Sequence, residues 1–204
     1  MSYSQFTSLN AVIEHFGLVE PNPSPSLFAQ TNALAPSPLL NELLTYHLKQ
    51  KTTYFSEKSR SEALVFPILL ELQRQHEHQI ALYSGANIEA DKEQGLNGEC
   101  DFVLAKGGQS YTLRTPIFCV VEAKDNDMKL GLPQCVAQMV GVQYFNDKKQ
   151  QQLPAVYGCV TTGRDWLFLR LQQKTLVIDD TIYSIENLPR LLGVLEDIVQ
   201  QFID

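Results

Sequence analysis

The most informative part of the sequence for the fold is the stretch Ile117-Phe118-Cys119-Val120-Val121-Glu122-Ala123-Lys124. Its first five residues are apolar without interruption, which is typical of a strand covered on both faces of a sheet. The strand then ends in a carboxylate and an ammonium two residues apart, which project from the same side of the backbone. Charges at the margin of a core are costly unless they pair or bind an ion. This stretch therefore predicts a buried central strand with a functional end.

Short segments rich in Val, Ile, Phe, Tyr and Leu surround this strand. They predict strands over residues 79–90, 99–105, 109–124, 155–162, 166–171 and 174–184. Apolar residues at helical spacing predict helices over residues 5–16, 39–49, 61–77, 132–146 and 188–203. The order of these elements predicts an α/β fold with a mixed central sheet flanked by helices. The helix at 132–146, opened by Pro133 at its first turn, supplies the crossover that makes the strand at 155–162 parallel to the buried strand.

The N-terminal part of the chain has a different character. Five prolines lie between Pro21 and Pro38 among serines and asparagines, which predicts an irregular connection. We therefore divide the chain into an N-terminal helical extension with a Pro-rich loop, residues 1–58, and an α/β domain, residues 59–204.

The composition excludes several classes of protein. The 204 residues are 44% hydrophobic and 19% charged with a net charge of −7, so the chain is not a generally basic nucleic-acid-coating protein. No apolar run approaches the roughly 20 residues of a membrane span. The four cysteines form no CxxC pair, which disfavours a structural zinc site. The N-terminus lacks the basic start and apolar core of a secretory signal, so we expect a cytoplasmic protein that does not bind membranes.

A second carboxylate accompanies the end of the buried strand. A hairpin between the strand at 99–105 and the buried strand would bring Asp101 alongside Glu122. Two adjacent carboxylates repel each other unless a divalent cation lies between them, and such hard oxygen ligands suit Mg²⁺ or Mn²⁺. Lys124 could hold or deprotonate a water aimed at phosphorus. The cluster predicts phosphodiester hydrolysis with Asp101 and Glu122 as the metal ligands.

These residues resemble the PD-(D/E)XK nucleases, which have a restriction-endonuclease-like fold. The likeness rests on Asp101, on Glu122-Ala123-Lys124 beginning 21 positions later, and on Glu62 and Gln138 in the flanking helices. The segment 160–166 is similar to a strand-turn-Trp segment in the nuclease domains of type I restriction subunits. The resemblance spans residues 60–171 and implies a three-layer core. It also implies that Asp101 and Glu122 bind Mg²⁺, Lys124 acts on the water, Glu62 assists the metal and Gln138 faces the site.

Each of these residues has a simpler interpretation. The triplet [D/E]xK occurs three times, also as Asp127-Met-Lys129 and Asp147-Lys-Lys149, and only Glu122-Ala-Lys124 ends an apolar strand. Glu122 and Lys124 could form a structural ion pair, and Asp101 could be a turn residue. Ser59-Arg60-Ser61-Glu62 matches a capping box, so Glu62 could fix a helix start. Gln138 could be a solvated helix residue.

The most basic segment of the chain precedes Glu62. Lys49, Lys51, Lys58 and Arg60 form either a solvated loop or a track for a phosphate backbone. Taken together, the sequence predicts a Mg²⁺-dependent nuclease, a metal-dependent phosphodiesterase that acts on DNA, with RNA and a homodimer left open. One alternative is a catalytically inactive restriction-endonuclease-like module that binds nucleic acid or a partner protein. The other is a structural module in which the three charges merely pair.

Overall fold

A computed structural model describes residues 2–22 and 24–203 of the chain. Six strands form one sheet in the order β1-β2-β3-β4-β5-β6. Neighbouring strands are antiparallel except β3 and β4, which run parallel. The strands are β1 (Ile80–Asp91), β2 (Leu96–Lys106), β3 (Ile117–Ala123), β4 (Val156–Thr161), β5 (Asp165–Gln172) and β6 (Thr175–Ser184). The prediction of an α/β fold with a mixed sheet is confirmed.

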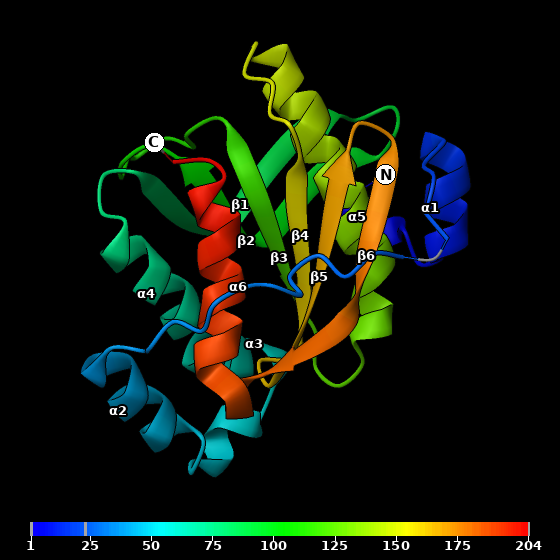
Figure 1. Ribbon diagram of the computed structural model, residues 1–204. Coiled ribbons are helices and arrows are strands. Elements are labelled where there is room, and N and C mark those ends of the chain that lie inside the picture. The colour runs from blue at the N-terminus through cyan, green and yellow to red at the C-terminus, as the bar shows by residue number, and fades with distance from the viewer. Residues whose placement is uncertain (1, 23, 204) are drawn as a thin grey trace.

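Helices cover both faces of this sheet and make a three-layer structure (Figure 1). One face packs against α2 (Pro38–His47), α4 (Phe66–Gln75) and α6 (Leu188–Gln200). The other face packs against α1 (Leu9–Phe16) and α5 (Met128–Lys148). The short elements are η1 (Tyr3–Gln5), η2 (Lys51–Tyr54), α3 (Glu57–Arg60), η3 (Ser61–Val65) and η4 (Ile185–Asn187).

Strand β3 is the centre of the core, as its apolar run predicts. All seven of its residues are buried. Phe118 and Val121 join the apolar cluster beneath α4 and α6, whereas Val120 joins the cluster beneath α5. The strand is shorter than the predicted segment 109–124, because Pro116 lacks the N–H that a strand ladder needs and the chain forms a loop before Ile117.

Helix α5 is the predicted crossover from β3 to β4, but it begins before the predicted residue 132. The Asp127 carboxylate accepts a hydrogen bond from the Lys129 N–H at 2.9 Å and caps the first turn. Pro133 therefore lies inside the helix and not in its first turn, which corrects the prediction. The added turns place the start of α5 beside the end of β3, at the lower end of the sheet in Figure 1.

The N-terminal residues contribute to both layers of the core. Val12 and Phe16 of α1 are buried on the α5 face, and Phe28 is buried on the opposite face. Val19 forms a parallel bridge to Thr175 at the free edge of β6. The described part of the N-terminal segment thus packs against the sheet through Val12, Phe16, Val19 and Phe28.

The cysteines and the helices bear on two of the protein classes considered from the sequence. All four cysteines are buried with free thiols, and burial raises the pKa of Cys119 to about 12. They behave as small core residues. Among the helices that the described residues form, none has both the length and the apolar character needed to cross a membrane.

Candidate active site

The pairing of β2 with β3 brings the two predicted metal ligands together. Phe102 lies opposite Val121, so the next step of the antiparallel ladder places Asp101 beside Glu122. The Oδ2 atom of Asp101 accepts a hydrogen bond from the Ala123 N–H at 2.7 Å. The predicted proximity of the two carboxylates is confirmed, and it arises from the register of the β2–β3 hairpin.

Glu122 is almost completely enclosed, with 1% of its surface exposed. The ammonium of Lys124 donates to Oε1 at 2.5 Å, and the side-chain amide of Gln138 donates to Oε2 at 2.7 Å. Burial, followed by the charge of Asp101, raises the pKa of Glu122 to about 7 against the opposing effect of Lys124 and Gln138. The protein therefore holds this carboxyl where its negative charge is costly.

Asp101 has a similar but more open environment. Burial raises the pKa of Asp101, whereas the Ala123 N–H and the charge of Lys124 act in the opposite direction. Its Oδ1 atom has no hydrogen-bond partner among the residues that the structure describes. Asp101 also lines a cavity of about 280 Å³. One carboxylate oxygen is thus free to accept a ligand.

Lys124 extends along the first turns of α5. Its ammonium lies 2.5 Å from Glu122 and 3.4 Å from the Oε1 atom of Gln134. Burial lowers the pKa of Lys124, but the charge and hydrogen bond of Glu122 more than offset this, so the pKa is raised. Gly131 makes room for the lysine, since a Cβ atom there would lie 2.9 Å from Lys124 Cγ and 2.6 Å from Val160 Cγ1.

Gln138 is fully buried, so the alternative of a solvated helix residue is wrong. Its amide nitrogen is bonded to Glu122, and its buried Oε1 atom lacks a hydrogen-bond partner among the described residues. An unpaired buried oxygen costs stability. The residue holds Glu122 in place from the α5 side, as the resemblance implies for a glutamine that faces the site.

The capping-box interpretation of Glu62 is also wrong. The N-cap is Ser56, whose Oγ atom accepts a hydrogen bond from the Ser59 N–H at 3.1 Å, so the helix begins earlier than predicted. Glu62 lies in the π-helical turn η3, is 64% exposed and pairs with Lys58 at 2.8 Å. Such turns are frequent at functional sites. Glu62 and Lys58 line the same 280 Å³ cavity as Asp101.

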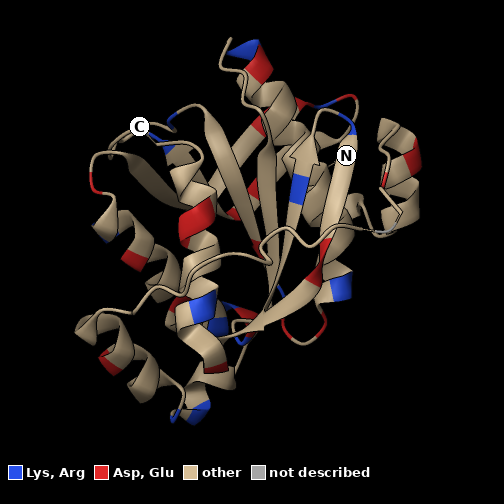
Figure 2. Ribbon diagram, viewed as in Figure 1, with Lys and Arg blue, Asp and Glu red and all other residues tan. Residues whose placement is uncertain are grey.

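The four predicted nucleic-acid-binding residues divide into two pairs. Lys49 and Lys51 are exposed and form no ion pair with a described residue. Lys58 is paired with Glu62, and Arg60 donates to the Asp125 carboxylate at 2.7 Å. Figure 2 shows acidic and basic positions mixed around η2, α3 and the lower end of the sheet. The free positive charge is therefore confined to the η2 end of this segment.

Sequence reasoning missed two carboxylates of the cavity. Glu99 lines it, and its charge raises the pKa of Asp101. Glu99 lies two residues before Asp101 on the same strand, so the two side chains project from the same face. This spacing could have revealed Glu99 from the sequence. Glu57 also lines the cavity and raises the pKa of Lys124, but its place follows from the packing of α3 and left no signal in the sequence.

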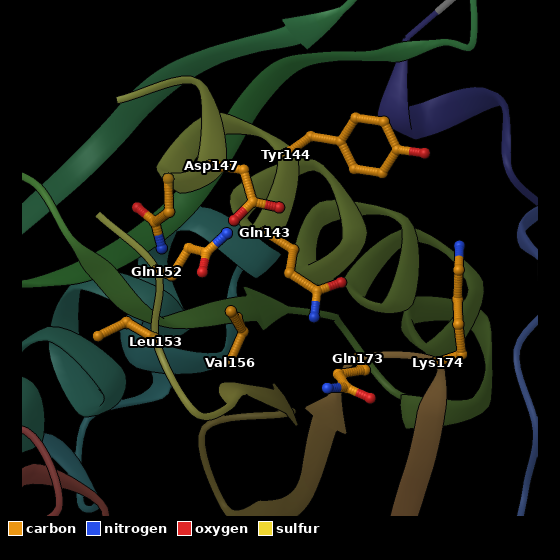
Figure 3. A pocket seen from close by; sticks show the side chains of 9 residues that line it. Gln143, Tyr144, Asp147, Gln152, Leu153, Val156, Gln173 and Lys174 are labelled. Carbon is orange, nitrogen blue, oxygen red and sulfur yellow. The ribbon is translucent and has the colours of Figure 1, made fainter. Parts of the chain in front are cut away.

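A separate cavity of about 440 Å³ lies between the C-terminal end of α5, the start of β4 and the β5–β6 turn (Figure 3). Polar side chains surround it, including those of Gln143, Asp147, Gln152 and Gln173. The Lys174 ammonium at its edge donates to the Phe16 carbonyl at 2.9 Å. It contains none of the predicted site residues.

Comparison with known proteins does not add to this description. No protein-family model matches the chain, and no curated protein matches it. Within residues 2–22 and 24–203, no group of three or more His, Cys, Asp or Glu side chains is arranged to hold a metal ion. The functional assignment therefore depends on the geometry around Asp101, Glu122 and Lys124.

Proposed function

We propose that this protein is a Mg²⁺-dependent nuclease that hydrolyses phosphodiester bonds of DNA, with Mn²⁺ as an alternative ion and RNA not excluded as a substrate. The observation that carries the proposal is the meeting of Asp101, Glu122 and Lys124 at the end of the buried strand β3. A strongly perturbed carboxyl group such as that of Glu122 is a frequent feature of functional sites.

The donor set fits a magnesium ion. Mg²⁺ is usually bound through one or two carboxylates, with waters and substrate phosphates completing its shell, so a third protein carboxylate is not required. Asp101 has an unpartnered oxygen and lines a cavity, and burial makes the negative charge of Glu122 costly. A cation beside them would relieve both costs. Asp101 and Glu122 are therefore the residues that would hold the ion.

The protein groups divide the chemistry between them. A bound Mg²⁺ supplies positive charge for the phosphoryl oxygens as hydrolysis proceeds. Lys124 keeps its proton at neutral pH because its pKa is raised, so it orients the attacking water by donating a hydrogen bond. Gln138 fixes the Glu122 carboxylate, and Glu62, which lines the same cavity as Asp101, would add negative charge near a bound metal ion.

The test is cleavage by the purified protein of plasmid and single-stranded DNA with Mg²⁺, with Mn²⁺ or with EDTA. We expect cleavage that requires the metal and is abolished by Lys124→Ala. The matched control is Lys129→Ala, which removes an exposed lysine from a [D/E]xK triplet outside the sheet. Equal activity of the two variants would contradict the role of Lys124.

One observation favours the inactive module as a second candidate. Both oxygens of Glu122 already have protein partners, Lys124 and Gln138, so this charge is paired without an ion. Metal binding without cleavage of any nucleic acid would favour that module. Absence of metal binding would favour a structural role for the charges.

A further inference from the structure

We propose that the active site continues into a pocket that binds an unpaired nucleobase, so that the substrate carries a single-stranded segment. This inference rests on the proposed nuclease function and specifies its substrate. The pocket is a cavity of about 350 Å³. It is lined by Tyr54, Arg60, Asp125, Asn126, Thr162, Arg164 and Asp165. Its volume lies at the lower end of the range for small-molecule sites, about 300 to 1,000 Å³.

The backbone joins this pocket to the catalytic cluster. Asp125 directly follows Lys124, and the Lys124 N–H donates to the Thr161 carbonyl at 2.8 Å. Thr162, the next residue, lines the pocket. The pocket and the catalytic cluster therefore share the ends of the paired strands β3 and β4.

The walls of the pocket offer what a nucleobase needs. The Arg60 guanidinium lies over the Tyr54 ring, 5.9 Å from its centroid, so the cation and the aromatic ring together form one wall of the pocket. Arg60 is held by Asp125, and its buried Nε atom has no partner among the described residues. Asn126 and Thr162 add amide and hydroxyl groups that can meet a base edge. A flat π-system with polar edges fits this lining.

The surface beside the pocket favours a single strand over a duplex. Phe55 is 86% exposed, next to Tyr54 at 36%, which is a large apolar exposure for adjacent aromatic residues. Lys51, on the same turn, has no ion-pair partner among the described residues. Aromatic rings with nearby cations are the platform on which unpaired bases stack. In a duplex the base faces are already stacked and cannot reach such a platform.

The experiment measures binding in EDTA, so that cleavage does not interfere. Fluorescence anisotropy is recorded with an oligothymidylate, an oligouridylate and duplex DNA of matched length. We expect Tyr54→Leu/Phe55→Ser to weaken binding of the oligothymidylate about tenfold or more. Binding of the duplex, which depends on phosphate contacts, should change by less than about twofold. The control Tyr111→Ser removes a fully exposed tyrosine from the loop before β3 and should change neither.

The single variant Phe55→Ser keeps the test valid if the double variant does not fold, since a side chain this exposed adds little to the core. Equal weakening of oligothymidylate and duplex binding, or no weakening of binding to either single strand, overturns the proposal. A loss of binding confined to the oligouridylate supports the base pocket and identifies RNA as the source of the bound base. A wild type that cleaves no substrate but shows the expected binding pattern contradicts the nuclease proposal alone. Cleavage without this pattern contradicts the base pocket alone.

Discussion

The buried carboxyl of Glu122 makes the stability of the metal-free protein depend on pH. Its pKa is about 7 in the folded protein, against an ordinary value of 4.5. Between these two values the folded protein holds a proton that the unfolded chain releases. The free energy of unfolding therefore falls as the pH rises from about 4.5 through 7. Glu122→Gln cannot titrate, so the variant lacks this dependence.

The size of the effect follows from the two pKa values. Each pKa unit corresponds to about 1.4 kcal/mol, so the full effect is about 3 kcal/mol. Most of it lies between pH 5 and pH 8, where we expect about 2 to 3 kcal/mol. The charge pairing of Glu122 with Lys124 exists only where Glu122 is ionised, and its effect is already included in the pKa of about 7.

Urea unfolding in EDTA at pH 5 and pH 8 measures this effect. The variant should gain about 2 to 3 kcal/mol on the wild type as the pH rises between these two values. The matched control is Glu89→Gln, which alters a carboxylate that is half exposed and paired with Lys92 at the surface. Its difference from the wild type should stay constant. If Glu122→Gln also shows a constant difference, the carboxyl of Glu122 is not perturbed and the reasoning is refuted.

Three further outcomes test the site. In thermal melts, Mn²⁺ should raise the Tm of the wild type and not that of Asp101→Asn/Glu122→Gln, because a ligand stabilises only a fold that binds it; equal shifts would remove the metal site. Gly131→Ala should lower the cleavage rate at least tenfold, about 1.4 kcal/mol of activation free energy, because the new Cβ would crowd Lys124; an unchanged rate would show that the lysine position is not critical. Glu62→Gln should keep stability within about 0.5 kcal/mol yet slow cleavage at least tenfold, and an unchanged rate would exclude Glu62 from the mechanism.

The sheet could be predicted from local patterns because the sequence of its central strand is uniformly apolar. The run from Ile117 to Val121 has no polar residue, and the helix between this strand and the next supplies the crossover that their parallel pairing needs. The predicted start of α5 is wrong because proline is a strong signal for the first turn of a helix and the prediction places Pro133 there. The actual N-cap, Asp127, is a single polar residue in a polar loop. The capping box failed for a similar reason, since Ser56 and Ser59 offer competing caps on one short segment.

The site could be predicted only in part. The placement of Asp101 beside Glu122 follows from the hairpin register, and the Lys58–Glu62 pair follows from i,i+4 spacing. The Arg60–Asp125 pair joins residues 65 positions apart, one at the end of α3 and one just after β3, so it depends on the tertiary fold. Local sequence holds no information on such packing, so the nucleobase pocket could emerge only from the folded chain.

The energetics of the charged cluster argue against a purely structural role. An apolar replacement of a buried ion pair is often neutral or stabilising, so stability alone does not require Glu122 and Lys124 inside the core. The cluster also includes the unpaired oxygens of Asp101 and Gln138, and a structural network would satisfy such atoms. In a site that binds a cation and a phosphate, by contrast, such oxygens are available to the ligand. We therefore favour the nuclease over a module in which the three charges merely pair.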